Sequence, residues 1–129
     1  MFKKTMLLAV FCLSSAMATE SLYQTGGVYN GRGWLADTVM EKLNYIYGMS
    51  DVARNFKCES ISDLWPGSEK ATYMEIVQIV DQFYADASNR AVPVLYALGW
   101  VKMKLRGDTP AALEKFAASL RRTAVGLAK

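Results

Sequence analysis

Three observations predict an all-α fold for this chain of 129 residues. Apolar residues recur at three- and four-residue spacing along several segments, which is the pattern of helices with one buried face. Helix start and stop signals separate these segments, and the alternation typical of strands never persists beyond a few residues. We therefore expect a small single domain, a bundle of about four helices over residues 34–128, after an irregular, partly flexible lead-in over residues 19–33.

The first eighteen residues are typical of a secretory signal peptide. Lys3 and Lys4 precede an apolar run over residues 6–13 that is too short to span a bilayer. Residues 16–18, Ala-Met-Ala, then give the small-x-small pattern that signal peptidase accepts. We expect cleavage before Thr19, export to the periplasm and no stable membrane insertion afterwards; an uncleaved N-terminal anchor is the alternative.

The first helix is expected to run from about Trp34 to Gly48, with a continuation to Ala53 left open. Its apolar face comprises Leu35, Val39, Leu43 and Ile46, widened by Ala36, Met40 and Tyr47. Gly48 is a credible stop, because glycine readily adopts the left-handed conformation that ends many helices.

A second helix is expected after a connecting loop over residues 55–67, which closes on the turn dipeptide Pro-Gly. Ser68 is a good N-cap for this helix, which extends to about residue 87. Either Tyr73 or Met74 belongs to its buried stripe.

The third and fourth helices are predicted from clear boundary signals. The third starts at residue 88 or 89, tolerates Pro93 in its first turn and ends at Gly107. Because residues 91–101 are apolar nearly all round, we expect it to be the central helix. The Asp-Thr-Pro sequence at 108–110 then starts a fourth helix that runs towards the C-terminus.

The charge of the chain says little about its partners until its distribution is considered. Without the two signal-peptide lysines the chain has 13 basic and 12 acidic residues, which gives no evidence for nucleic acid or an anionic membrane as a partner. However, residues 19–89 hold 5 basic and 10 acidic residues, whereas residues 90–129 hold 8 and 2. This asymmetry suits an oriented, electrostatically assisted contact; two solvated faces of a small domain are the alternative.

The residue types argue against catalysis. The chain has no histidine, which removes Ser-His and Cys-His nucleophile pairs, histidine bases and nearly all ordinary zinc sites. We therefore expect no enzyme, no cofactor and no metal site. Cys58 is the single cysteine beyond the signal peptide, so it is either a buried small hydrophobe or half of an intermolecular disulfide. A homodimer is thus left open.

The loop aromatic Trp65 stands apart from the aromatic residues at helical core positions. It lies between Asp63 and the Pro-Gly turn. One interpretation is a plug that folds back on the core, and the other is a partner-facing anchor of the kind that dominates binding hot spots.

Part of the chain, from about Leu43 to Asp108, resembles the Tai/Rap family of periplasmic immunity proteins of type VI secretion. Residues 44–51, Asn-Tyr-Ile-Tyr-Gly-Met-Ser-Asp, are similar to the family's Gly-Tyr-Ile-x-Gly-x-x-Asp helix, which singles out Tyr45, Gly48 and Asp51. Residues 56–58 resemble its Phe-Cys element through Cys58, with one extra residue. The segments 74–84, 91–93 and 95–100 resemble its later helices. Family members commonly carry further cysteines, which this chain lacks.

The resemblance implies a function in binding. Such proteins protect a bacterium against peptidoglycan-degrading amidases delivered by sister cells, by docking onto the toxin and blocking its active site. The resemblance thus implies a protein partner, a cell-wall amidase toxin, with the loop around Arg54, Lys57, Asp63 and Trp65 as the expected contact region. A periplasmic chaperone or adaptor that binds an envelope protein is the alternative.

Overall fold

The computed structural model describes residues 22–55, 65 and 71–129 of the chain. The described part is mostly helical, at 76% of its residues, which confirms the all-α prediction. Its elements in order are strands β1 (Gln24–Thr25) and β2 (Val28–Tyr29), helices α2 (Gly31–Ala36), α3 (Val39–Asn55) and α5 (Tyr73–Ala85), the 3₁₀ turn η1 (Ala87–Asn89), and helices α6 (Val94–Arg106) and α7 (Pro110–Leu127). The predicted signal peptide lies outside the described residues.

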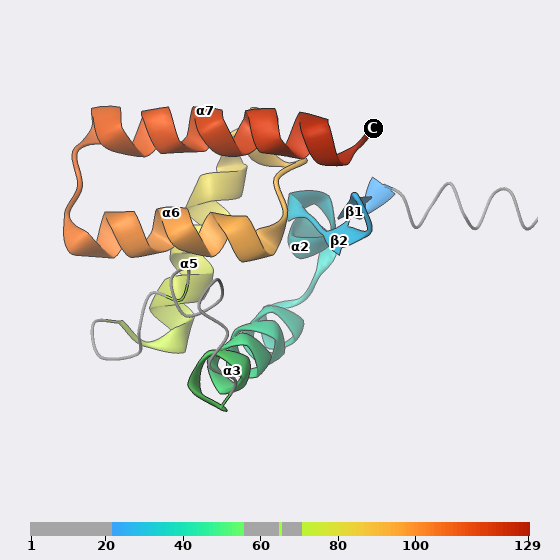
Figure 1. Ribbon diagram of the computed structural model, residues 1–129. Coiled ribbons are helices and arrows are strands. Elements are labelled where there is room, and N and C mark those ends of the chain that lie inside the picture. Colours follow the sequence, from blue (N-terminus) through green and yellow to red (C-terminus); the bar gives the residue numbers. More distant parts are fainter. Residues whose placement is uncertain (1–21, 56–64, 66–70) are drawn as a thin grey trace, which may run out of the picture.

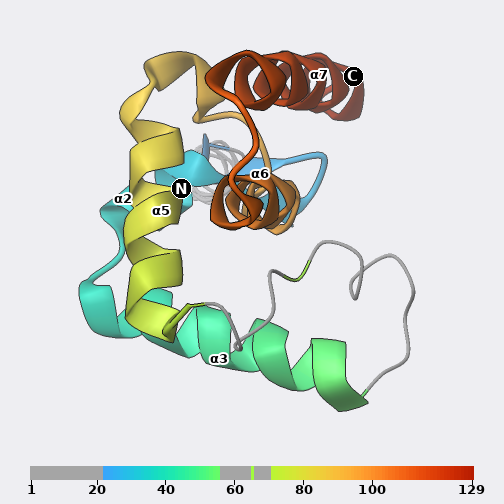
Figure 2. The same cartoon turned by 90° about the vertical axis from the view of Figure 1, so that its left-hand side faces the viewer.

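The helices are arranged around α5 (Figures 1 and 2). Helices α6 and α7 form an antiparallel pair, α5 crosses behind it, and α3 packs on α5 at the end of the molecule away from α7. Helix α5 therefore contacts α2, α3, α6 and η1, so it shares the central position that the sequence predicted for the third helix alone. No helix within the described ranges is both long and apolar enough to cross a bilayer.

The core lies where α5 meets its neighbours. Trp34, Ile46, Ile76, Leu98 and Val101 are fully buried there. Helix α6 buries Val94, Ala97, Leu98 and Val101 and partly buries Tyr96 and Trp100, because it lies between α5 and α7. Burial of an aliphatic or aromatic side chain of this size stabilises the fold by about 1.5–3 kcal/mol.

The lead-in is more ordered than the sequence predicted. From residue 22 onwards it forms the β1–β2 hairpin, whose Gly26 and Gly27 both have positive φ. This is the backbone of the tight turns that suit the twist of a two-stranded hairpin, and glycine adopts it without strain. The prediction of an irregular segment was therefore wrong for residues 24–33.

Asn30 joins this hairpin to α2 and is itself fully buried. Its side-chain oxygen accepts bonds from the backbone N–H groups of Arg32 (3.0 Å) and Gly33 (3.3 Å), which caps α2. Its amide nitrogen donates to the Leu22 carbonyl and to Thr25 Oγ1, at 3.2 Å each. The Asn30 side chain thus forms hydrogen bonds with groups at the start of α2 and at the base of the hairpin.

The first predicted helix is two helices in the structure. Asp37 has an extended backbone and ends α2, and Thr38 starts α3. The Thr38 N–H donates to Glu41 Oε2 at 2.7 Å, and Thr38 Oγ1 accepts from the Glu41 N–H at 3.3 Å, which is the reciprocal pattern of a capping box. Gly48 lies inside α3, which continues to Asn55, so the predicted stop at Gly48 was wrong.

The buried face of α3 also differs from the prediction. Its buried side chains are Lys42, Ile46 and Ser50, while Val39, Met40 and Tyr47 are exposed. Two other predicted starts were wrong: helix α5 begins later, at Tyr73 with Thr72 as its cap, and α6 begins at Val94 and not at residue 88 or 89. The Gly107 end of α6 and the Pro110 start of α7 are confirmed.

Candidate functional site

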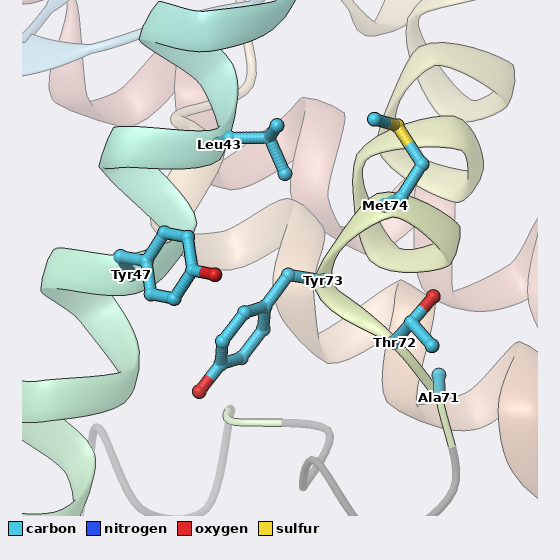
Figure 3. Close-up of a pocket in the computed structure, with 6 residues that line it drawn as sticks. All are labelled: Leu43, Tyr47, Ala71, Thr72, Tyr73 and Met74. Carbon is cyan, nitrogen blue, oxygen red and sulfur yellow. The ribbon is translucent and has the colours of Figure 1, made fainter.

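An open groove lies between α3 and the start of α5 (Figure 3). It encloses about 430 Å³ and is lined by Leu43, Tyr47, Ala71, Thr72, Tyr73 and Met74. Leu43 and Tyr47 project from α3 towards α5, and Met74 lines the opposite wall. Tyr47 and Met74 are 54% and 41% exposed, so the groove presents apolar surface to solvent.

The floor of the groove is held in place by Tyr73. Its ring packs edge-on against Tyr47 with centroids 4.5 Å apart, and the Trp65 ring lies 6.3 Å away on another side. Its hydroxyl lies 2.8 Å from Oγ of the buried Ser50 and accepts a bond from Arg54 at 3.4 Å. These contacts fix the Tyr73 ring in place before a partner binds, which lowers the entropy cost of binding.

One carboxylate, that of Glu75, lies next to the α5 side of the groove lining. Residues 71–89 contain Glu75, Asp81 and Asp86 and no basic residue. Glu75 closes the capping box of α5, because the N–H of Thr72 donates to its carboxylate at 2.7 Å. Bonds from the Thr72 backbone and hydroxyl lower the pKa of Glu75, so this carboxylate is charged at neutral pH beside the groove.

A buried ion pair fixes α3 against α5. Asp81 Oδ1 accepts bonds from Lys42 Nζ at 2.9 Å and from the Trp34 indole N–H at 2.7 Å. The Lys42 ammonium also lies over the Trp34 ring, 5.5 Å from its centroid. Asp81, on α5, therefore binds residues from α2 and α3 together.

Of the four predicted contact residues the structure describes Arg54 and Trp65, and both lie beside Tyr73. Arg54 lies at the end of α3 and reaches Tyr73, at the edge of the groove. Trp65 is 9% exposed and packs in the core, which is the plug interpretation, so its indole is not an exposed anchor. Lys57, Cys58 and Asp63 lie outside the described residues.

The residues singled out by the family resemblance fall on two sides of α3. Tyr45 faces inwards, where it packs against Tyr29 and Trp34, and burial raises its pKa to about 12. Gly48 and Asp51 are on the exposed side. The first of these residues is structural, and the other two are accessible to a partner.

Gly48 has no packing role that would explain a glycine. A Cβ placed on it meets nothing within 4 Å, and its φ is not positive. We expect Gly48→Ala to raise the free energy of unfolding by about 0.5–1 kcal/mol, because alanine favours the helix and loses less entropy on folding. Urea denaturation followed by circular dichroism measures this change. A destabilised variant would show that the space around Gly48 is filled.

Sequence reasoning missed the groove because it placed Tyr47 on the buried face of its helix and left Tyr73 and Met74 as alternatives. One available signal was the Thr-x-x-Glu sequence at residues 72–75, which is a capping box. It starts α5 at Tyr73, beside the aromatic lining of the groove.

No group of three or more Cys, Asp or Glu side chains that could hold a metal ion occurs in the ranges that the structure describes. No protein-family model matches the chain, and comparison with curated proteins and with solved structures found no significant match.

Proposed function

We propose that this chain is a periplasmic immunity protein that binds a cognate peptidoglycan-degrading amidase toxin of type VI secretion and inhibits it sterically. The observation that carries the proposal is the preformed groove between α3 and α5, with exposed apolar walls and the Glu75 carboxylate beside Thr72 of its lining. Binding hot spots combine such buried apolar anchors with a polar rim. The partner that fits is a toxin surface with an apolar side chain for the groove and basic residues around it.

The family resemblance supports the same face of the molecule. Its best motif, residues 44–51, forms the middle of α3, and this segment carries Tyr47 in the groove wall. Gly48 and Asp51 are exposed on the same helix. A glycine with open space around it allows a partner backbone to approach α3 closely. Asp51 adds a negative charge that attracts a basic partner.

Steric inhibition does not require the chain to catalyse a reaction. A protein that covers the substrate groove of an amidase needs a stable, complementary surface and no nucleophile or base. The absence of histidine is therefore compatible with the function. Opposite charges on the two partners speed their encounter and disfavour wrong partners.

The proposal is tested by protection against toxins encoded beside this gene. Each candidate amidase is directed to the periplasm with and without this protein, and cell lysis is followed by optical density. Purified pairs are then tested for a complex by size-exclusion chromatography and titration calorimetry. Neutralisation of one amidase with a tight complex is the expected result. If no toxin is neutralised and only an envelope protein is bound, the chaperone or adaptor alternative replaces the proposal.

A pair of variants tests whether the groove is the contact surface. We expect Tyr47→Asp with Met74→Asp to weaken toxin binding about thirtyfold or more, because the variant places charge where apolar anchors must be desolvated. Val39→Asp is the matched control, since Val39 lies on the same helix and is 52% exposed but does not line the groove. Equal binding by both variants would place the contact elsewhere on the protein.

A further inference from the structure

Two exposed basic residues of α7 and one just after its end lie at heptad spacing on the outer side of the helix. Lys115, Arg122 and Lys129 are seven residues apart and all are exposed. Seven residues are close to two helical turns, so the three side chains share one face over roughly 21 Å. Ala128 keeps near-helical dihedral angles, which brings Lys129 into the same line. We call these three residues the basic stripe.

The positive charge of the stripe is not neutralised within the described part of the protein. None of the three makes a hydrogen bond or an ion pair with the residues that the structure describes. Residues 90–129 contain two carboxylates, and both are engaged by arginines outside the stripe. Asp108 pairs with Arg106, and Glu114 pairs with Arg121. With eight basic residues, this half of the fold has a net charge of +6.

The positions between the charges are small or apolar. Ala118 lies between Lys115 and Arg122, and Val125 lies between Arg122 and Lys129, each at three- or four-residue spacing. Val125 is 61% exposed without a packing partner that would explain it. The line therefore alternates cationic side chains with alanine and valine, so no acidic side chain stands between the cations.

The opposite end of the molecule has the opposite charge. Helix α7 and helix α3 lie at opposite ends of the fold in both views (Figures 1 and 2). Residues 19–89, which include α3 and α5, hold 10 acidic and 5 basic residues, a net charge of −5. An anionic surface therefore attracts α7 and repels the groove, and it orients the protein with the groove away from the surface.

We propose that the outer face of α7 docks on a membrane surface rich in anionic phospholipid. A flat array of headgroups can meet all three cations of a straight helix at once, and Val125 adds an apolar contact at the headgroup boundary. The line carries no aromatic side chain, which a single-stranded nucleic acid would use for base stacking. The proposal rests on the charges and exposure of α7 and is independent of the proposed function.

The experiment is vesicle flotation with the full chain. The vesicles contain phosphatidylcholine alone or with about 30 mol% phosphatidylglycerol, at about 50 mM and about 500 mM NaCl, since salt screens such contacts. The stripe variant combines Lys115→Gln, Arg122→Gln and Lys129→Gln. The control variant combines Asn44→Asp, Asn55→Asp and Gln78→Glu, all exposed on α3 or α5, and has the same net charge as the stripe variant. Every protein carries the same N-terminal segment, so any affinity of that segment for lipid cancels.

We expect the wild type and the control to bind the anionic vesicles, and the stripe variant to bind about tenfold or more weakly at low salt. The difference should vanish at high salt and be absent on pure phosphatidylcholine. If both variants lose vesicle binding equally, net charge alone determines the binding. If the stripe variant binds as well as the wild type, the stripe does not contribute. Stripe-dependent binding to a short DNA duplex without binding to vesicles would replace the membrane with nucleic acid. Each of these three results overturns the proposal.

Discussion

Replacing Gly31 with alanine is expected to lower the free energy of unfolding by about 3 kcal/mol. A Cβ at this position overlaps the ring of Tyr84. That ring has nowhere to move, because Tyr84 is fully buried and its hydroxyl donates to the Val92 carbonyl at 2.9 Å. The better helix propensity of alanine offsets less than about 1 kcal/mol of the loss.

Urea denaturation of Gly31→Ala and of Gly48→Ala, measured separately, compares the free energies of unfolding of two variants of the same protein. The two substitutions are chemically identical and both lie in helices, but a Cβ meets a buried ring at one position and open space at the other. Opposite signs of the change are therefore expected. Wild-type stability in Gly31→Ala would mean that α2 does not pack on Tyr84 as described.

Asp81→Ala is expected to cost about 2–3 kcal/mol, because it leaves the Lys42 charge buried and without its partner. The Lys42 side chain is 10% exposed, whereas that of Asp81 is 42% exposed, so the expected cost lies below that of a fully buried pair. The indole N–H of Trp34 loses its acceptor in the same variant. Chemical denaturation measures the loss.

Rescue by a second substitution distinguishes an unpaired charge from a simple loss of packing. Lys42→Met in the Asp81→Ala background removes the stranded ammonium and keeps most of the aliphatic volume, so stability should rise relative to Asp81→Ala alone. A double variant that is less stable than Asp81→Ala would show that Lys42 contributes through its contact with the Trp34 ring and not through the ion pair.

The sequence predicted the helices better than their faces. The start at Pro110 and the end at Gly107 follow from local chemistry, since proline lacks an N–H and glycine tolerates positive φ, and both are confirmed. The buried stripe of α3 was placed wrongly because its members include Lys42 and Ser50. Each is polar, and each is buried only because a residue of α5, distant in sequence, supplies its partner. Periodicity alone cannot reveal such a partner.

The groove could not be predicted from the sequence for the same reason. Whether Tyr47 is core or surface depends on where α5 begins, and the capping box at Thr72 and Glu75 determines that start. The α2–α3 break has an equivalent signal at Thr38 and Glu41. By contrast, nothing local to Trp65 distinguishes a plug from an anchor, because the answer depends on the neighbouring Tyr73 and the core behind it.

The hairpin contact with α7 has a consequence for how the fold is completed. A Cβ on Gly26 would lie 2.8 Å from the Leu127 carbonyl oxygen, so the turn of the hairpin rests on the last turn of α7. Residues about one hundred positions apart therefore meet, although synthesis delivers the chain from its N-terminal side. The hairpin must wait for the final helix before its packing is complete. During refolding, the backbone amides of the hairpin and of Leu127 should therefore be the last to gain protection from hydrogen exchange.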